Sequence, residues 1–315
     1  MADSSRTGPT GADSGTGDAD ESGTTDESGG PEGRDDANRT GLTRRRLLLG
    51  AGGAAGALGG GGVYVSRVLD GEAAGFTAPT THPVLDSRGR ALEGRPERAG
   101  SWGFEDAEAV FLFVHGFATD ATDARDQAYT AERGLHEIWT DDDPVVAYSW
   151  DADIGWGDAK READATAGPL ADWLIEWADE DARPVHLLGY SLGARVTGAL
   201  LQHLTERNRP DVLASVSLLG GAIPRASVTR DGTYGPAIEG VSAPVTNFHS
   251  RNDRVLGWVY RASDRVRAVG RGGVAASASL PEGYRDVDVT DLVEDHYSYF
   301  QPGAGCLQRV VERIE

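Results

Sequence analysis

The sequence predicts a doubly wound α/β fold, a mostly parallel β-sheet with helices on both faces, and two observations support this prediction. The first is a series of short runs that are rich in β-branched or aromatic residues and almost free of charge. They span residues 109–117, 143–150, 184–191, 213–221 and 242–250. Such runs are typical of strands covered on both faces, and hence of central, parallel strands.

The second observation is the pair of helix-like segments between these runs, residues 158–181 and 192–206. Both carry large apolar side chains at helical spacing: Leu170, Trp173, Leu174 and Trp177 in the first, and Val196, Leu200, Leu201 and Leu204 in the second. Core packing explains these side chains better than a ligand site does. Strands alternating with helices, without an internal repeat, predict one α/β domain over residues 67–315.

The first 42 residues differ sharply from this body. They consist mostly of small and acidic residues, with ten acids against three arginines. A segment of this composition buries too little apolar surface to offset the entropy lost on ordering. We therefore expect residues 1–42 to form a disordered acidic tail.

Residues 43–66 resemble a twin-arginine export signal. Arg44, Arg45 and Arg46 precede an uncharged stretch, residues 47–65, that is rich in glycine and alanine. A weak apolar region after paired arginines is typical of such signals. No clear cleavage site follows, so the stretch either is removed or stays as a membrane anchor, being just long enough to span. We expect export by the twin-arginine machinery, to the medium or to the outer face of the membrane.

The charge balance restricts the partners. The formal net charge is −20, and Lys160 is the single lysine among 30 basic residues. An acid excess with few lysines indicates adaptation to concentrated salt, whereas a GC-rich genome explains only the missing lysines. The same surface is unsuited to nucleic acid, which requires clustered basic residues. One cysteine, Cys306, excludes an intrachain disulfide and a cysteine-based zinc site.

The candidate nucleophile is Ser191, in the stretch "HLLGYSLGARV". It lies where a predicted strand gives way to a predicted helix, and Gly189 and Gly193 flank it two residues away on each side. A nucleophile on such a strained turn needs small neighbours. The amide of Leu192, at the start of the helix, is then placed to stabilise an oxyanion. The motif alone is weak in a glycine-rich chain, and its strand–helix setting carries the prediction.

A second oxyanion donor is expected in the loop that follows the apolar strand 110–114. There Gly116 permits a sharp turn, and the amide of Phe117 is the candidate donor. We interpret the neighbouring His115 as a structural residue that holds the turn, rather than as a catalytic base.

The acid and the base are expected later in the chain, in that order. Asp253 follows the run 242–250 and is the candidate acid; His296 is the one histidine beyond it. Asp295 is an alternative acid, although a residue adjacent to the histidine on a loop rarely points at its ring. The sequence thus predicts a Ser191–His296–Asp253 triad on an α/β-hydrolase fold, with no metal and no organic cofactor.

Four segments together resemble a poorly characterised family of α/β-hydrolases. They are "GYSLGARV", "SVSLLGGAIP", "HSRNDRVLGWVYR" and "DVDVTDLVEDHYSYF". The family includes the transmembrane-and-coiled-coil-domain protein four and fungal relatives. The likeness covers residues 108–300 and departs at the N terminus, where the family's long helical and membrane-spanning regions are replaced by the export signal. The resemblance implies the same triad and points to lipid or ester substrates.

These expectations combine into an exported serine hydrolase that cleaves carboxylic esters, with residues 222–241 as a loop bordering its site. Two alternatives stay open. One is a non-catalytic hydrolase-fold binding or scaffold protein at the cell envelope. The other is an acyltransferase or peptidase that uses the same triad.

Overall fold

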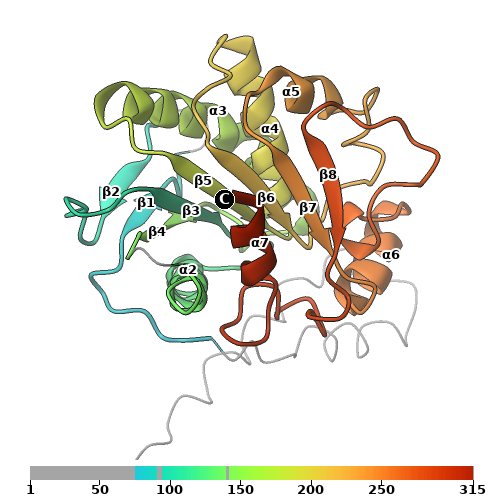
Figure 1. Ribbon diagram of the computed structural model, residues 1–315, viewed down its shortest axis with the longest axis horizontal. Helices are drawn as coiled ribbons and strands as arrows, with labels where there is room; N and C mark the ends of the chain where they lie inside the picture. Colours follow the sequence, from blue (N-terminus) through green and yellow to red (C-terminus); the bar gives the residue numbers. More distant parts are fainter. Residues whose placement is uncertain (1–74, 91–93, 140–141, 315) are drawn as a thin grey trace, which may run out of the picture. The chain divides into compact units, whose positions relative to one another are not determined.

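A computed structural model describes residues 75–314, apart from residues 91–93 and 140–141 (Figure 1). These residues all lie in the second of two compact units, Leu48–Glu315. The expected acidic tail and the expected export signal, residues 1–66, lie outside the described residues, so both stay predictions.

An eight-stranded sheet forms the centre of the described part of the chain, with strand order β2-β1-β4-β3-β5-β6-β7-β8. Every neighbouring pair is parallel except β1 and β2. The strands are β1 (Val84–Asp86), β2 (Glu97–Ala99), β3 (Val110–Val114), β4 (Val145–Ser149), β5 (Val185–Tyr190), β6 (Ser215–Leu219), β7 (Val245–His249) and β8 (Tyr284–Asp288). All five runs predicted as strands are confirmed, as β3 to β7.

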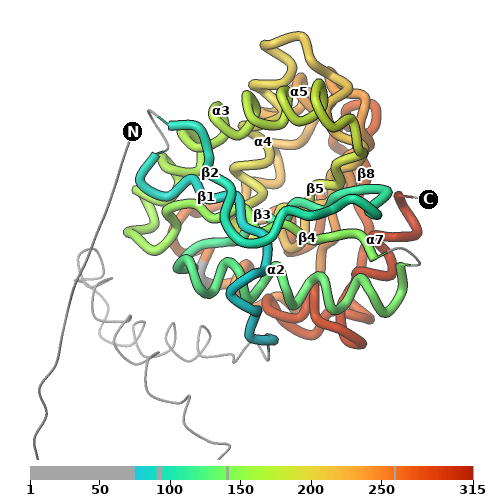
Figure 2. The backbone as a smooth tube through the Cα atoms, turned by 90° about the vertical axis from the view of Figure 1, so that its left-hand side faces the viewer, coloured from blue at the N-terminus to red at the C-terminus, as the bar shows by residue number. Residues whose placement is uncertain are grey.

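Helices cover both faces of the sheet, as the doubly wound prediction requires. Figures 1 and 2 show α3 (Trp156–Glu180), α4 (Gly193–Glu206) and α5 (Gly235–Gly240) on one face and α2 (Ala121–Leu135) and α7 (Leu307–Ile314) on the other. The two predicted helices agree with α3 and α4 to within two residues at each end. Three shorter helical turns complete the set of described helices: η2 (Val255–Tyr260), α6 (Arg261–Asp264) and η3 (Val269–Arg271).

The central strands are apolar on both faces because both faces are covered. In β3, Val110, Leu112 and Val114 pack with α3 and α4, whereas Phe111 and Phe113 pack with α2 and α7. Successive side chains of a strand point to opposite faces, so a strand buried on both sides has no polar alternation.

The C-terminal segment is fixed to the second face through Cys306. Its side chain is fully buried, and its thiol donates to the carbonyl of Tyr299 at 3.4 Å. Burial raises the pKa of the Cys306 thiol. None of the helices that the structure describes is long and apolar enough to cross a bilayer.

Candidate active site

Ser191 lies on a strained turn between β5 and α4. Its φ angle is 53°, in the left-handed region that side chains other than glycine rarely adopt. The two flanking positions require glycine because neighbouring atoms leave no space for a Cβ. A Cβ on Gly193 would lie 2.2 Å from the carbonyl oxygen of Val114, and one on Gly189 would lie 2.4 Å from Thr197 Oγ1. The start of α4 therefore packs directly against the end of β3.

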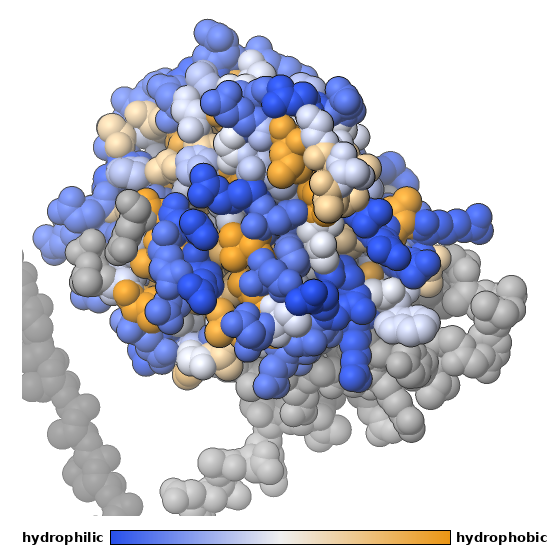
Figure 3. Space-filling model, turned by 45° about the vertical axis from the view of Figure 1, so that its right-hand side comes forward, coloured by the Kyte–Doolittle hydropathy of each residue, from blue (hydrophilic) through white to orange (hydrophobic). Residues whose placement is uncertain are grey.

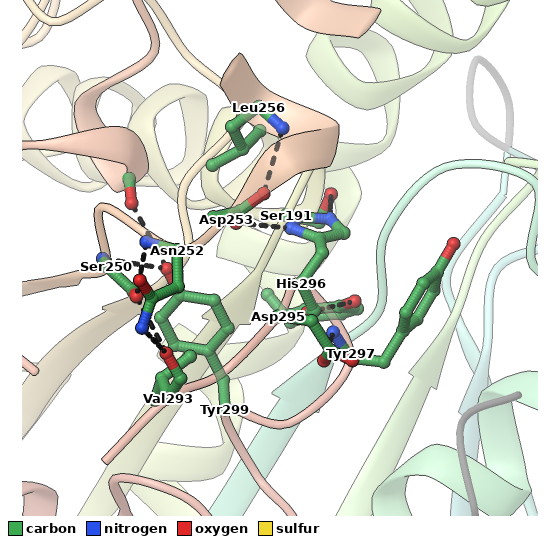
Figure 4. A network of polar contacts seen from close by, with 12 residues as sticks. Ser191, Ser250, Asn252, Asp253, Leu256, Val293, Asp295, His296, Tyr297 and Tyr299 are labelled. Atoms are coloured by element: carbon green, nitrogen blue, oxygen red, sulfur yellow. Dashed lines mark hydrogen bonds and ion pairs between the residues drawn. The ribbon is translucent and has the colours of Figure 1, made fainter. Parts of the chain in front are cut away.

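Three buried side chains from three separate loops form one hydrogen-bonded chain (Figure 4). His296 Nδ1 lies 2.6 Å from Asp253 Oδ2, and His296 Nε2 lies 2.9 Å from Ser191 Oγ. An ionised carboxylate only accepts hydrogen bonds, so Nδ1 donates and Nε2 of the neutral ring accepts from the serine hydroxyl. Ser191, His296 and Asp253 are 7%, 5% and 0% exposed. The structure thus brings together the three residues of the predicted triad.

Asp253 is held by the backbone around it. It follows β7, and its Oδ1 accepts the N–H of Leu256 at 2.9 Å. Two preceding side chains tie this loop to the loop of His296: Ser250 Oγ donates to the carbonyl of Val293 at 2.8 Å, and Asn252 Nδ2 donates to the same carbonyl at 3.2 Å (Figure 4). The acid and the histidine therefore keep their relative positions without depending only on their own hydrogen bond.

The aromatic side chain of Tyr190 holds His296 through its ring and its hydroxyl group. The ring of Tyr190 lies 5.2 Å from the ring of His296, and the Tyr190 hydroxyl donates to the His296 carbonyl at 2.9 Å. Burial holds the pKa of Tyr190 well above its ordinary value, so this hydroxyl keeps its proton. Asp295, the alternative acid, is exposed and accepts the N–H of Tyr297 at 2.9 Å. It makes no contact of the kind that Asp253 makes with the imidazole.

The two predicted oxyanion donors lie beside Ser191. Leu192 is the residue at the N terminus of α4, and Phe117 follows Gly116, where a Cβ would lie 2.7 Å from Ser191 Cβ. Among the residues that the structure describes, the N–H groups of Phe117 and Leu192 donate to no acceptor. Both are therefore available to an oxygen that approaches Ser191.

His115 holds the turn that carries Phe117. Its Nδ1 donates to the carbonyl of Gly116 at 3.0 Å, and its Nε2 accepts the N–H of Trp150 at 3.1 Å. The imidazole also stacks on Trp150, with an interplanar angle of 12°. Burial lowers the pKa of His115 to about 3, so the ring is neutral. The structural role expected for this residue agrees with these contacts.

The segment 222–241 reaches the site only at its beginning. The N–H of Ala222 donates to the carbonyl of Ser191 at 2.8 Å. Ala222 also forms a small buried cluster with Leu256, Tyr260 and Ala268, against which Trp156 packs. Further along, the segment forms α5, which packs on α4; the last residue of α5, Gly240, lies against Thr205, near the end of α4 that is opposite to Ser191. Leu256, Tyr260 and Ala268, which sequence reasoning did not single out, lie in the buried cluster beside Ala222.

The sheet order and the strand–turn–helix unit at Ser191 define an α/β-hydrolase fold, as the sequence predicts. Residues 145–312, just over half of the chain, match the family described as protein of unknown function (DUF726). The chain belongs to this family.

Three curated relatives match about half of this chain. An uncharacterized membrane protein of Schizosaccharomyces pombe, C6F6.13c, is 32% identical over 47% of this chain and 18% of its own length. The transmembrane and coiled-coil domain-containing protein STS1 of Oryza sativa is 32% identical over 54% of this chain and 25% of its own length. A probable lipase of Saccharomyces cerevisiae, MIL1, is 28% identical over 50% of this chain and 14% of its own length. The chain thus spans a quarter or less of the length of these relatives.

These names agree with the resemblance noted in the sequence, a family with transmembrane and coiled-coil domain proteins and fungal members. The family match begins at residue 145 and leaves the twin-arginine segment untested. Among solved structures, the mature Bacillus licheniformis lipase BlEst2 is 16% identical, with a TM-score of 0.40 over 70% of this chain and 93% of that one. A structure of the metagenome-derived LipS and LipT enzymes is 12% identical, with a TM-score of 0.38 over 76% and 97%.

Proposed function

We propose that this protein is a serine hydrolase that cleaves carboxylic esters. The observation that carries the proposal is the hydrogen-bonded chain from Ser191 through His296 to Asp253, with the serine on a left-handed turn between strand and helix. A relative named as a probable lipase supports the same class of reaction. Lipid or other apolar esters are therefore the proposed substrates.

The proposed reaction follows from the order of the three groups. Ser191 Oγ attacks the ester carbonyl while His296 Nε2 takes the hydroxyl proton, and Asp253 stabilises the imidazolium. The N–H groups of Phe117 and Leu192 receive the oxyanion. His296 returns the proton to the leaving alcohol, which frees an acyl-enzyme. A water molecule then attacks the acyl group while His296 takes its proton, and His296 returns this proton to Ser191 Oγ as the carboxylic acid leaves.

The test is labelling of the folded protein with a fluorophosphonate, together with turnover of p-nitrophenyl esters. Ser191→Ala should remove the label and lower turnover on the order of 10⁶-fold, the loss measured for a nucleophile in a studied protease. Ser217→Ala is the matched control, because Ser217 is another buried serine on the neighbouring strand β6. A folded parent protein that neither labels nor turns over ester would instead be a non-catalytic scaffold. Transfer to an alcohol, or cleavage of an amide, would identify the acyltransferase or peptidase alternative.

We also propose that the protein is exported through the twin-arginine route. The support is the run Arg44-Arg45-Arg46 before the uncharged residues 47–65. Changing all three arginines to lysine should trap folded protein inside the cell, because the export receptor distinguishes guanidinium pairs from other positive charges. Arg34→Lys with Arg39→Lys is the control, and cell fractionation is the measurement. Normal export of the triple variant would exclude this route.

A further inference from the structure

Arginines concentrate in the segment that follows the candidate acid. Residues 251–271 contain six arginines and two aspartates, in a chain with 50 acidic and 30 basic residues. Both aspartates are engaged elsewhere: Asp253 with His296, and Asp264 with Lys160 at 2.5 Å and Trp156 at 2.8 Å. This part of the surface is therefore positive in an acidic protein.

Four of these six arginines, together with Arg225, line a cavity beside η2 and α6. Its volume is about 690 Å³, and its walls include Arg225, Arg251, Arg261, Arg267 and Arg271 together with Leu256 and Trp258. A smaller hollow of about 360 Å³ continues along Arg225, Arg261 and Arg265. Figure 1 shows α6 on the right-hand side of the view, and Figure 3 brings this side forward, where hydrophilic side chains cover most of the surface. The larger cavity has the size of a small-molecule site.

Most of these guanidinium groups lack an anionic partner. Arg251 pairs with Asp288 at 2.9 Å. Within the described part of the chain, the other four arginines of the cavity wall form no ion pair, and Arg271 Nη1 is shielded from solvent without a hydrogen-bond acceptor. The arginines of helix α4 and of the turn after it do have acidic partners: Arg195, Arg207 and Arg209 each pair with an aspartate. Like charges gathered without counter-charges are unfavourable unless an anion joins them.

The cavity lies close to the candidate active site. Leu256 and Ala268 belong to its wall and share a buried cluster with Ala222, whose N–H donates to the carbonyl of Ser191. Leu256 also donates its N–H to Asp253. Two residues of the cavity wall are thus connected to the triad through one intervening contact or hydrogen bond.

Guanidinium groups bind phosphate oxygens through paired hydrogen bonds, and several of them together favour a phosphate over a lone carboxylate. Trp258, on the wall of the same cavity, is 64% exposed. An exposed tryptophan among basic residues suits the boundary between lipid headgroups and acyl chains. We propose that this cavity binds the phosphate-bearing headgroup of an anionic ester lipid while the ester reaches Ser191, an inference that rests on the proposed hydrolase function.

The test measures binding separately from catalysis. Full-length protein carrying Ser191→Ala is co-sedimented with phosphatidylglycerol vesicles and with phosphatidylcholine vesicles, at the lowest salt at which circular dichroism shows it folded. We expect a clear preference for phosphatidylglycerol. Adding Arg261→Gln and Arg267→Gln should weaken this binding about 30-fold, or about fivefold for each arginine. Arg309→Gln with Arg313→Gln removes the same charge from α7, which contributes nothing to the cavity wall, and should change binding less than about twofold.

Each contrary result has one meaning. Equal binding to both vesicles, or full binding by the Arg261→Gln, Arg267→Gln protein, overturns the inference. Calorimetric binding of inorganic phosphate without binding to phosphatidylglycerol vesicles also overturns it, because the cavity would then be a site for a free anion. Fluorophosphonate labelling of the parent protein keeps the two proposals distinct. Labelling without lipid preference refutes only the headgroup site, and lipid preference without labelling refutes only the hydrolase.

Discussion

A methyl group on Gly116 would collide with the candidate nucleophile. A Cβ at this position would lie 2.7 Å from Ser191 Cβ and 3.1 Å from Ser191 Oγ, whereas ordinary contacts begin at 3.4 Å. Gly116 does not have a positive φ, so its backbone accepts alanine and only the space is lacking. Ser191, or the loop that carries Phe117, must therefore move by about 0.7 Å, the difference between these contacts.

A displacement of this size disturbs the 2.9 Å hydrogen bond from Ser191 to His296 and the position of the oxyanion donors. A misplacement near 1 Å lowers turnover about 100-fold, equivalent to about 2.7 kcal/mol in the activation free energy. Overpacking should also lower the free energy of unfolding by about 1–3 kcal/mol.

The assay is kcat for a neutral p-nitrophenyl ester, with thermal melting measured on the same preparation. Gly157→Ala is the control, because a Cβ there has only one neighbour, a guanidinium nitrogen of Arg161 at 3.9 Å. Parent-like kcat in a folded Gly116→Ala protein would refute the assignment of this loop to the active site.

Three further predictions concern the acid, a buried histidine and salt. Asp253→Asn should lower kcat about 10⁴-fold without unfolding the protein, as the equivalent change does in a studied triad, whereas Asp295→Asn should have little effect; comparable losses in both would reject Asp253 as the acid. His115 is neutral in the folded protein because burial lowers its pKa to about 3, whereas the unfolded chain takes up this proton near pH 6.5. The contribution of this neutral imidazole to the free energy of unfolding is fully present above pH 6.5 and is lost as the pH falls toward 3, by about 2 kcal/mol between pH 7 and pH 5. Urea titrations should therefore show a shallower pH dependence of the unfolding free energy for His115→Gln. An unchanged pH dependence would contradict burial of His115 as the cause. With a net charge of −20, the protein should melt at lower temperature as KCl falls from molar to millimolar concentration, and a constant melting temperature would favour the genomic explanation of its composition.

The elements that sequence reasoning found are those with large apolar side chains on both faces or at helical spacing. Helix α2 was not predicted, and the reason is its buried side: Ala124, Ala128, Thr130, Ala131, Gly134 and Leu135. Small residues let the helix approach the sheet closely, but they leave it without the large apolar side chains that mark α3 and α4 in the sequence. Strand β2 was missed because its three residues are exposed at the sheet edge. Strand β8 lies outside the five predicted runs; Val287 and Val289 alternate as strand residues do, and the strand ends at Asp288.

The residues of the triad could be chosen from chain order, because strands that run parallel end at the same edge of the sheet. The residues that hold the triad in place could not be chosen in this way. Tyr190 contacts His296 although 106 positions separate them, and no local pattern marks a tyrosine that will donate to a distant carbonyl. The arginines after Asp253 were visible as a count in the sequence. Their convergence on one cavity depends on the turns η2 and α6, whose residues show no clear period.

The buried thiol of Cys306 can report how often the C-terminal segment opens, without an added label. It is the single cysteine, it is fully buried, and burial raises its pKa, so an alkylating reagent can react only after the segment around it separates from the sheet. Because the thiol donates a hydrogen bond to the carbonyl of Tyr299, three positions beyond His296, its labelling rate measures how often the segment from Tyr299 to Cys306 opens. The rate of Cys306 alkylation, followed by mass spectrometry, would therefore compare the opening of this segment with and without bound ligand.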